Sequence, residues 1–291
     1  MIKKIIICFM IFVLTVYVII NVNFLKERSG SINQSVRLKQ NPVKTPTMDF
    51  VESKLYYDDK ILSIYVHNRD DLISREIINT GTWEGGWTKE LINYIKTNNG
   101  ITFIDVGCNI GVYTLIAASL GAKVIAIDAN ENNTIRLNQS LIKNNLRPLV
   151  TLLNNAASDE RKEFSMTSVY DNIGHQEIVN STNNSYKVRS ILLDDLVRFI
   201  DKSQSAFMKI DIENHEILAF RKASLLFDNV NIKLVLIEWM FIKDNPNVNS
   251  LLNFFQKRNY RPYSNMFATT LLNVDQHKSW GQNIVWIKKE N

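Results

Sequence analysis

The sequence predicts a doubly wound α/β domain with a mostly parallel, Rossmann-like sheet. From about residue 101 onward, strand-like apolar runs alternate with helix-like segments, and such alternation gives parallel strands joined by right-handed crossovers. The clearest unit is 103–130, FIDVGCNIGVYTLIAASLGAKVIAIDAN, which reads as a strand, a glycine-containing turn, a helix and a second strand ending in an acid. This layout is typical of a nucleotide-type cofactor site at the edge of a parallel sheet.

Apolar periodicity and end signals place the elements along the chain. Residues 49–80 mix apolar pieces with charges and predict a small β-rich or mixed segment. Trp83–Trp87 predicts a loop, after which Thr88 is expected to cap a helix. We expect strands at 101–106, 123–128, 149–154, 206–210, 231–238, 260–263 and 283–287, and helices at 88–96, 112–120, 131–145, 194–201, 214–227 and 249–258.

Two of these segments carry more specific expectations. In the predicted helix 214–227, Ile217, Leu218 and Leu225 are expected to face the sheet. Residues 156–189 interrupt the strand–helix alternation and predict a strand or hairpin followed by a polar loop rich in Asn and Ser. The acceptor of any group transfer is expected to be recognised in part by this insertion.

The N-terminus predicts a membrane anchor. Residues 1–4 include Lys3 and Lys4, and residues 5–25 are predominantly apolar, close to the roughly 20 residues that span a bilayer. We expect a short cytosolic tail, a transmembrane signal anchor at 5–25 and a polar stem at 26–48. A cleaved signal peptide and a soluble helix are the alternatives. Residues 49–291 are then one domain, with its core at 80–240.

The excess positive charge belongs to the N-terminal region. Through Thr47 there are seven Lys/Arg and one Asp/Glu, which leaves 27 Lys/Arg (34 − 7) against 28 Asp/Glu (29 − 1) in the remainder. The predicted domain is therefore near neutral and lacks the basic footprint of a nucleic-acid-binding protein. A membrane-facing stem explains the charge more simply.

The turn after the first strand indicates which kind of cofactor is bound. It runs from Asp105 through Gly107 and Asn109 to Gly111, so asparagine stands where a dinucleotide fold has the glycine that lets the backbone approach a pyrophosphate. This favours a cofactor without a pyrophosphate, such as S-adenosylmethionine. The two glycines are expected to allow a tight turn and close cofactor approach, and Asp105 to accept from the amino group of the methionine moiety.

Acids and amides at the next strand ends extend this cofactor site. Asp128, followed by Ala129, ends the second strand, where a carboxylate grips ribose hydroxyls. Asn155 follows the third strand and is expected to bind the adenine, with Ala156 leaving room for it. An ordinary turn is the alternative for Asn155 and Ala156.

A second group of polar residues follows the fourth strand. Asp211, Glu213, His215 and Glu216 lie within six residues, at the sheet edge where open α/β sheets bind their ligands. His215 is expected to be a general base, because histidine titrates near neutral pH. Helix capping accounts for one of these acids but not for the group.

The fifth strand adds a further candidate at the same edge. Glu238 closes that strand and is expected to join Asp211 and His215 in catalysis, although a carboxylate satisfied at a strand end is the alternative. A metal site made by Asp211, His215 and Glu238 is a further alternative. His175, in the insertion, is a weaker candidate for the acceptor site.

Three stretches resemble the FkbM family of S-adenosylmethionine-dependent methyltransferases. FIDVGCNIGVYT is similar to the family's D-x-G-A-N-x-G-x-Y turn, with Cys108 in place of alanine. MKIDIENHE resembles its K-I-D-x-E-G-H-E box, with Asn214 in place of glycine, and VRSILLDDL resembles the lead-in to that box. Glu84 and Thr88 also match family positions. The resemblance implies a class I methyltransferase fold and O-methylation of hydroxyls. Asn214 is expected to keep the turn, since asparagine tolerates left-handed backbone geometry.

These observations together predict a membrane-anchored O-methyltransferase that uses S-adenosylmethionine. A tail, one span, a stem and a catalytic domain is the layout of Golgi glycan-modifying enzymes, so a glycan hydroxyl is the expected acceptor. The same layout predicts a type II orientation with the domain in the Golgi or endoplasmic reticulum lumen. Methylation of a lipid or other small molecule and an inactive cofactor-binding scaffold are the alternatives.

Overall fold

The computed structural model describes residues 50–68, 71–167, 178–179, 185–201 and 204–290. The chain divides into two units, Met1–Lys39 and Gln40–Asn291, and all described residues belong to the second. The predicted tail, anchor and stem, as well as His175, lie outside the described residues. Within the part that is described, no helix is both long and apolar enough to cross a membrane.

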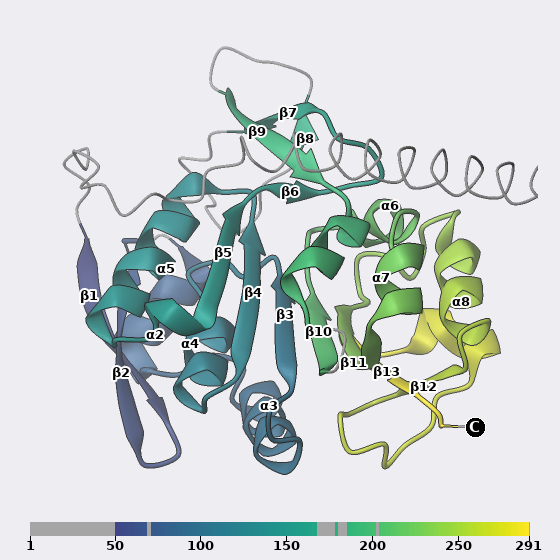
Figure 1. Ribbon diagram of the computed structural model, residues 1–291, viewed down its shortest axis with the longest axis horizontal. Helices are drawn as coiled ribbons and strands as arrows, with labels where there is room; N and C mark the ends of the chain where they lie inside the picture. Colours follow the sequence, from purple (N-terminus) through teal and green to yellow (C-terminus); the bar gives the residue numbers. More distant parts are fainter. Residues whose placement is uncertain (1–49, 69–70, 168–177, 180–184, 202–203, 291) are drawn as a thin grey trace, which may run out of the picture. The chain divides into compact units, whose positions relative to one another are not determined.

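A seven-stranded sheet organises the domain, in the order β12-β13-β11-β10-β3-β4-β5 (Figure 1). Its strands are β3 (Thr102–Val106), β4 (Lys123–Asp128), β5 (Val150–Asn154), β10 (Ser205–Ile210), β11 (Asn231–Glu238), β12 (Tyr260–Tyr263) and β13 (Asn283–Lys288). Strands β5, β4, β3, β10 and β11 pair in parallel, whereas β13 is antiparallel to both of its neighbours. The predicted mostly parallel, Rossmann-like sheet is confirmed.

Helices alternate with these strands as the sequence predicts. They are α3 (Gly85–Thr97), α4 (Val112–Ser119), α5 (Glu131–Lys143), α6 (Glu216–Phe220), α7 (Ser224–Asn229) and α8 (Val248–Gln256), with 3-10 turns η1 (Arg147–Leu149), η2 (Leu193–Phe199) and η3 (Val274–Ser279). All five residues of β3 are buried, as expected for a central strand covered on both faces. Phe103 of β3 stacks on Phe207 of β10, with 4.5 Å between ring centroids.

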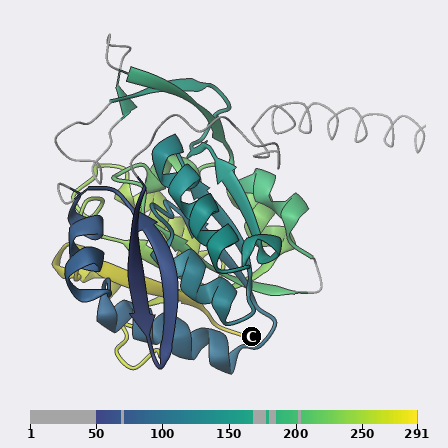
Figure 2. The ribbon, with the colours of Figure 1, turned by 90° about the vertical axis from the view of Figure 1, so that its left-hand side faces the viewer.

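The mixed N-terminal segment forms a hairpin and a helix. Strands β1 (Val51–Tyr57) and β2 (Lys60–Val66) pair antiparallel, and α2 (Leu72–Thr80) follows. Figure 2 shows the hairpin in purple beside the helices of the adjoining sheet. Strand β2 lies along α5, where the backbone N–H of Tyr65 donates to Ser140 Oγ at 2.9 Å.

The insertion after β5 forms a small sheet of its own. The order of neighbouring strands across this sheet is β6 (Ala156–Ala157), β9 (Ser185–Ile191), β7 (Glu163–Thr167) and β8 (Ile178–Val179). In Figure 1 this sheet lies beyond the carboxyl end of β5. The predicted hairpin is confirmed for the described part of the insertion.

The predicted start of α3 is wrong. Thr88 does not cap the helix; it lies within α3, where its Oγ1 donates to the carbonyl of Trp83 at 2.7 Å. The helix begins at Gly85, and Glu84 is the N-cap residue with a left-handed φ of 45°. Most of the expected 83–87 loop therefore belongs to the first turn of the helix.

The prediction of a single helix at 214–227 is also wrong. This segment forms two helices, α6 and α7. The break is held by Asp194 of η2, whose N–H donates to Lys222 O and whose Oδ1 accepts from Leu226 N, both at 2.9 Å. The break shifts the buried face, so Leu225 is 37% exposed whereas Leu226 is buried. Ile217 is buried as predicted.

Candidate active site

A cavity of about 360 Å³ lies at the carboxyl edge of the parallel strands. It is lined by all the residues that the sequence predicts for cofactor binding or catalysis: Asp105, Gly107, Asn109, Gly111, Asp128, Ala129, Asn155, Ala156, Asp211, His215 and Glu238. Across the sheet, five of them follow the order of the strands: Asn155 after β5, Asp128 on β4, Asp105 on β3, Asp211 after β10 and Glu238 on β11.

The two glycines of the turn serve contacts inside the protein. Gly107 has a φ of +81°, and a Cβ there would lie 1.8 Å from the carbonyl oxygen of Asp211. Gly111 has a φ of +90°, and its Cβ would lie 2.2 Å from Leu137 Cδ1 of α5. Packing inside the protein is thus one reason for glycine at both positions. Both glycines also line the cavity, and the expectation that they allow close cofactor approach stays a prediction.

Asp128 joins the turn to the end of β4. Its Oδ2 accepts from Asn109 N at 2.7 Å, and its Oδ1 accepts from Asn130 N at 2.8 Å and from Asn133 Nδ2 at 3.2 Å. Burial raises the pKa of Asp128 to about 6. The side chain is thus fixed in position, and it changes charge just below neutral pH.

A chain of hydrogen bonds behind Asp128 was not expected from the sequence. His67, after β2, lies with its Nε2 2.7 Å from Asn133 Oδ1, and Asn133 is the residue that donates to Asp128. Because Asn133 Nδ2 faces the carboxylate, its oxygen accepts from His67 Nε2–H. Burial lowers the pKa of His67, which favours this neutral, donating form.

Two buried oxygens in the cavity wall lack a partner. Asp105 accepts from Thr114 Oγ1 at 2.6 Å through Oδ2, but Oδ1 has no hydrogen bond among the described residues. Asn155 donates to the carbonyl of Arg189 at 2.9 Å, and its Oδ1 likewise has no partner. Buried acceptors of this kind call for a donor from a ligand or a water molecule.

Lys209 is a site residue that the sequence reasoning missed. It lies in β10 two residues before Asp211, which directly follows the strand, and both residues line the cavity. Its Nζ donates to Asp211 Oδ2 at 2.9 Å, and it lies 5.3 Å from the ring centroid of Tyr113. Burial alone would lower the pKa of Lys209, but Asp211, Asp105 and Glu84 raise it above its ordinary value.

The turn between β10 and α6 has the geometry that the sequence predicts at Asn214. Glu213 and Asn214 have φ values of 53° and 69°, so asparagine does hold the left-handed position. The side chain of Glu216 stabilises the turn, because its Oε1 accepts from Ile212 N at 2.8 Å. Burial raises the pKa of Glu216 to about 7. His215 lines the cavity from this turn, half-buried.

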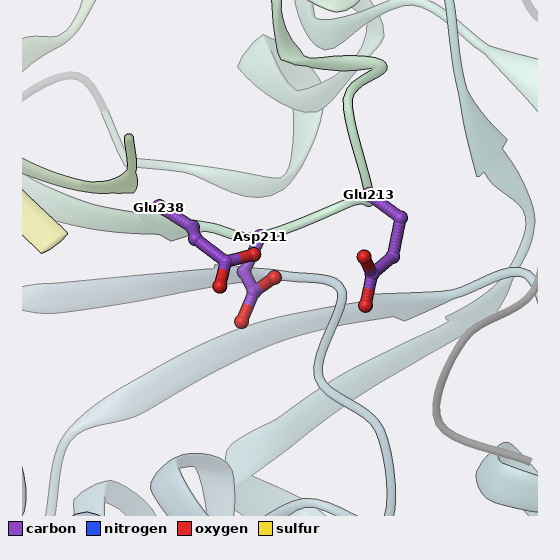
Figure 3. Close-up of side chains that lie close together, drawn as sticks. All are labelled: Asp211, Glu213 and Glu238. Carbon is purple, nitrogen blue, oxygen red and sulfur yellow. The ribbon is translucent and has the colours of Figure 1, made fainter. Parts of the chain in front are cut away.

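The side chains of Asp211 and Glu238 lie next to each other (Figure 3) and are joined by a hydrogen bond. Burial, followed by the charge of Asp211, raises the pKa of Glu238 to about 9. Burial alone would raise the pKa of Asp211, but Lys209 and a hydrogen bond with Glu238 hold it below its usual value. At neutral pH, Glu238 is therefore protonated and donates to the ionised Asp211.

The metal set considered from sequence is not the one that the fold assembles. Among the described residues, Asp211, Glu213 and Glu238 place ligand atoms within 4.8 Å of one another, with Glu213 in the place of His215. A divalent cation there would have to displace the proton of Glu238 and compete with the Lys209 ammonium. The arrangement fits proton handling better than metal binding.

The strand order with an antiparallel β13, together with a cavity over β3 and β4, defines a class I S-adenosylmethionine-dependent methyltransferase fold. The methyltransferase FkbM domain family matches residues 105–262, over half of the chain, and the chain belongs to this family. It is a methyltransferase, and its cofactor is S-adenosylmethionine. The resemblance read from Asp105–Tyr113 and Lys209–Glu216 is confirmed.

Solved structures with this fold are distant in sequence. A SAM-dependent methyltransferase from Agrobacterium tumefaciens is 11% identical with a TM-score of 0.44, over 84% of this chain and 73% of that one. An O-methyltransferase from Bacillus cereus with bound SAH is 11% identical with a TM-score of 0.41, over 71% and 82%. The O-methyltransferase TomG from Streptomyces achromogenes with bound SAM is 8% identical with a TM-score of 0.40, over 71% and 82%. Among curated proteins, no sequence matches this chain.

The described residues fit this cofactor. The unpartnered Oδ1 of Asp105 suits the amino group of the methionine moiety, and the unpartnered Oδ1 of Asn155 suits the amino group of adenine. Asp128 lies on β4, between the strands that carry these two residues, as the ribose lies between adenine and methionine. The arrangement is consistent with the prediction that Asn155, Asp128 and Asp105 bind adenine, ribose and methionine in that order.

Cofactor affinity is expected to fall below about pH 6. If Asp128 binds the ribose as predicted, its ionised carboxylate accepts from the ribose hydroxyls, and its raised pKa means that it loses this charge as the pH falls through about 6. If only the ionised form binds, the Kd for S-adenosylmethionine rises about tenfold per pH unit below that point. Calorimetry at pH 5 and pH 7.5 measures this. Asp128→Asn, checked for folding, should lose most of the dependence; a wild-type Kd that does not change over this range contradicts the role.

Proposed function

We propose that the protein transfers a methyl group to a hydroxyl oxygen. The observation that carries this proposal is the set of proton-accepting groups at one end of the cavity, where His215 and the ionised Asp211 lie beyond the cofactor residues of β3 and β4. A neutral hydroxyl is a weak nucleophile until its proton is leaving, so an O-methyltransferase needs such a base. S-adenosylmethionine supplies an electrophilic methyl group.

His215 is the proposed general base. It lines the cavity from the β10–α6 turn, and its Nδ1 makes one long contact, at 3.4 Å, with the carbonyl oxygen of Glu213. Glu216 holds this turn by accepting from Ile212 N. His215 is thus positioned to take the hydroxyl proton as the oxygen–methyl bond forms.

Asp211 and Glu238 are proposed to orient the acceptor. The protonated Glu238 fixes Asp211 from one side and Lys209 fixes it from the other, so the carboxylate cannot turn away from the cavity. A carboxylate that is held in this way accepts a hydrogen bond from the substrate hydroxyl and aligns it for in-line attack. Alignment accounts for much of the rate in such transfers. Gln282, which hydrogen-bonds Glu238, completes this wall.

A glycan hydroxyl is the proposed acceptor. The cavity wall combines polar groups with the exposed apolar side chains of Leu72, Met240 and Phe241, which suits a sugar ring that presents both hydroxyls and an apolar face. The predicted anchor at 5–25 and its stem are the reason for proposing a type II membrane protein. The domain of such a protein acts in the Golgi or endoplasmic reticulum lumen. The same apolar wall also suits a lipid acceptor.

Transfer of a labelled methyl group to separated cell fractions tests this proposal. The purified protein is incubated with methyl-labelled S-adenosylmethionine and with glycan, lipid or small polar metabolite fractions, and each product is analysed by mass spectrometry. We expect the label in the glycan fraction. Label in the lipid fraction alone would replace the glycan by the lipid acceptor, and no transfer to any fraction would favour an inactive cofactor-binding scaffold.

A further inference from the structure

Lys209 brings a positive charge into a part of the site dominated by carboxylates. It is 8% exposed, it lines the cavity, and Asp211, Asp105 and Glu84 all act on its charge. Hydrogen bonds among the described residues use one of its three N–H groups, the bond to Asp211. A buried ammonium retains its charge only with such partners, and two of its donors are left for another group.

The sheet register sets Lys209 directly beside Asp105. Strands β3 and β10 pair in parallel with Lys209 opposite Asp105, and both side chains line the cavity. Asp105 Oδ1, buried and unpartnered, is an acceptor, while Lys209 Nζ is a donor. The protein therefore presents one acceptor and one cationic donor on adjacent strands.

We propose that Lys209 binds the carboxylate of the methionine moiety of S-adenosylmethionine, while Asp105 accepts from its amino group. An α-amino acid carries a cationic and an anionic group on one carbon, which matches an acid and a lysine on neighbouring strands. This amino-acid end of the cofactor is zwitterionic and has no net charge. It therefore adds no repulsion to a site that already contains the carboxylates of Asp211, Asp105 and Glu84. The proposal rests on the cofactor and not on the identity of the acceptor.

The other strands are consistent with this direction of binding. Asn155 and Asp128 lie on the β5 and β4 side of Asp105, and Lys209 lies on the opposite side, on β10. The carboxylate is the end of the cofactor most distant from adenine, and Lys209 is correspondingly farther along the sheet edge from Asn155 than Asp105 is. The ring of Tyr113 lies 5.3 Å from Lys209 Nζ, and the Tyr113 hydroxyl donates to Glu84 at 2.6 Å. Tyr113 therefore packs beside the lysine.

Binding of decarboxylated S-adenosylmethionine, which has hydrogen in place of the carboxylate, tests the proposal. Isothermal titration of the full chain with each cofactor form gives two dissociation constants and their ratio. We expect the wild type to bind S-adenosylmethionine ~10- to 100-fold more tightly, the range for a hydrogen bond between charged groups. In Lys209→Met this ratio should fall to about one, because the partner of the carboxylate is gone.

The ratio separates binding from a purely structural role. If Lys209 only neutralises Asp211, Lys209→Met weakens both forms equally and keeps the ratio, which overturns the proposal. A wild type that binds both forms equally overturns it without any variant. Lys209→Arg should keep most of the ratio because it keeps the cation, and it provides the test if Lys209→Met does not fold. Lys233→Met, in β11 and away from the cavity, is the control and should leave both constants unchanged.

Discussion

Replacing Gly107 by alanine is expected to lower the free energy of unfolding by more than about 3 kcal/mol and to abolish cofactor binding. Its φ of +81° is already unfavourable for alanine, by roughly 1–2 kcal/mol. In addition, the new Cβ would lie 1.8 Å from Asp211 O and 2.8 Å from Asp211 C. Both are backbone atoms, so the turn and the strand end must move apart, which costs more than a side-chain adjustment.

Gly121→Ala is the matched control for this substitution. Gly121 has a φ of +89°, but a Cβ there would meet nothing within 4 Å. The difference between the two variants in thermal or denaturant unfolding therefore isolates the contact with Asp211 from the backbone strain. If Gly107→Ala is no less stable than Gly121→Ala, the turn does not pack against Asp211 as described.

Replacing His215 by alanine is expected to lower kcat by about 10²-fold or more, the usual contribution of a general base. Cofactor affinity should change little, because Asn155, Asp128 and Asp105 are the residues assigned to the cofactor. Turnover with labelled cofactor and calorimetry with S-adenosylmethionine measure the two effects separately. Added imidazole should restore part of the rate, since it supplies the missing base.

Asn214→Gly is the control for this experiment. Glycine suits the φ of 69° at this position, so the turn should be kept and turnover should stay within a few-fold of the wild type. Unchanged turnover in His215→Ala would remove His215 from the role of base, and the ionised Asp211 would then be the candidate. Loss of turnover together with loss of cofactor binding would show that the substitution disturbs the whole site.

Elements determined by local pattern could be predicted closely from the sequence. The bounds of β4 and β11 agree with prediction, because buried strands read as apolar runs that polar residues end. Those of the edge strand β12 agree as well. The cavity residues were predicted because the carboxyl ends of parallel strands meet at one edge. The two-residue periodicity of strands would have suggested Lys209, since it lies near the end of β10, two positions before Asp211.

Features that depend on distant residues could not be predicted in this way. The break between α6 and α7 is made by Asp194, which contacts Lys222 and Leu226 across the fold. The packing reason for Gly107 lies in the backbone of Asp211, which is on a different strand end. Likewise, the link from His67 through Asn133 to the cavity joins residues 66 positions apart. Spacing in the sequence contains no signal for such contacts.

The atom that receives the methyl group is the most direct test of the central claim. The labelled product, made by the purified protein from the acceptor fraction that takes up label, is analysed by heteronuclear NMR, which distinguishes methyl groups on oxygen, nitrogen and carbon. A methyl group bonded to a former hydroxyl oxygen is the predicted result, because His215 and Asp211 are proposed to remove a hydroxyl proton. A methyl group on nitrogen or carbon would contradict it.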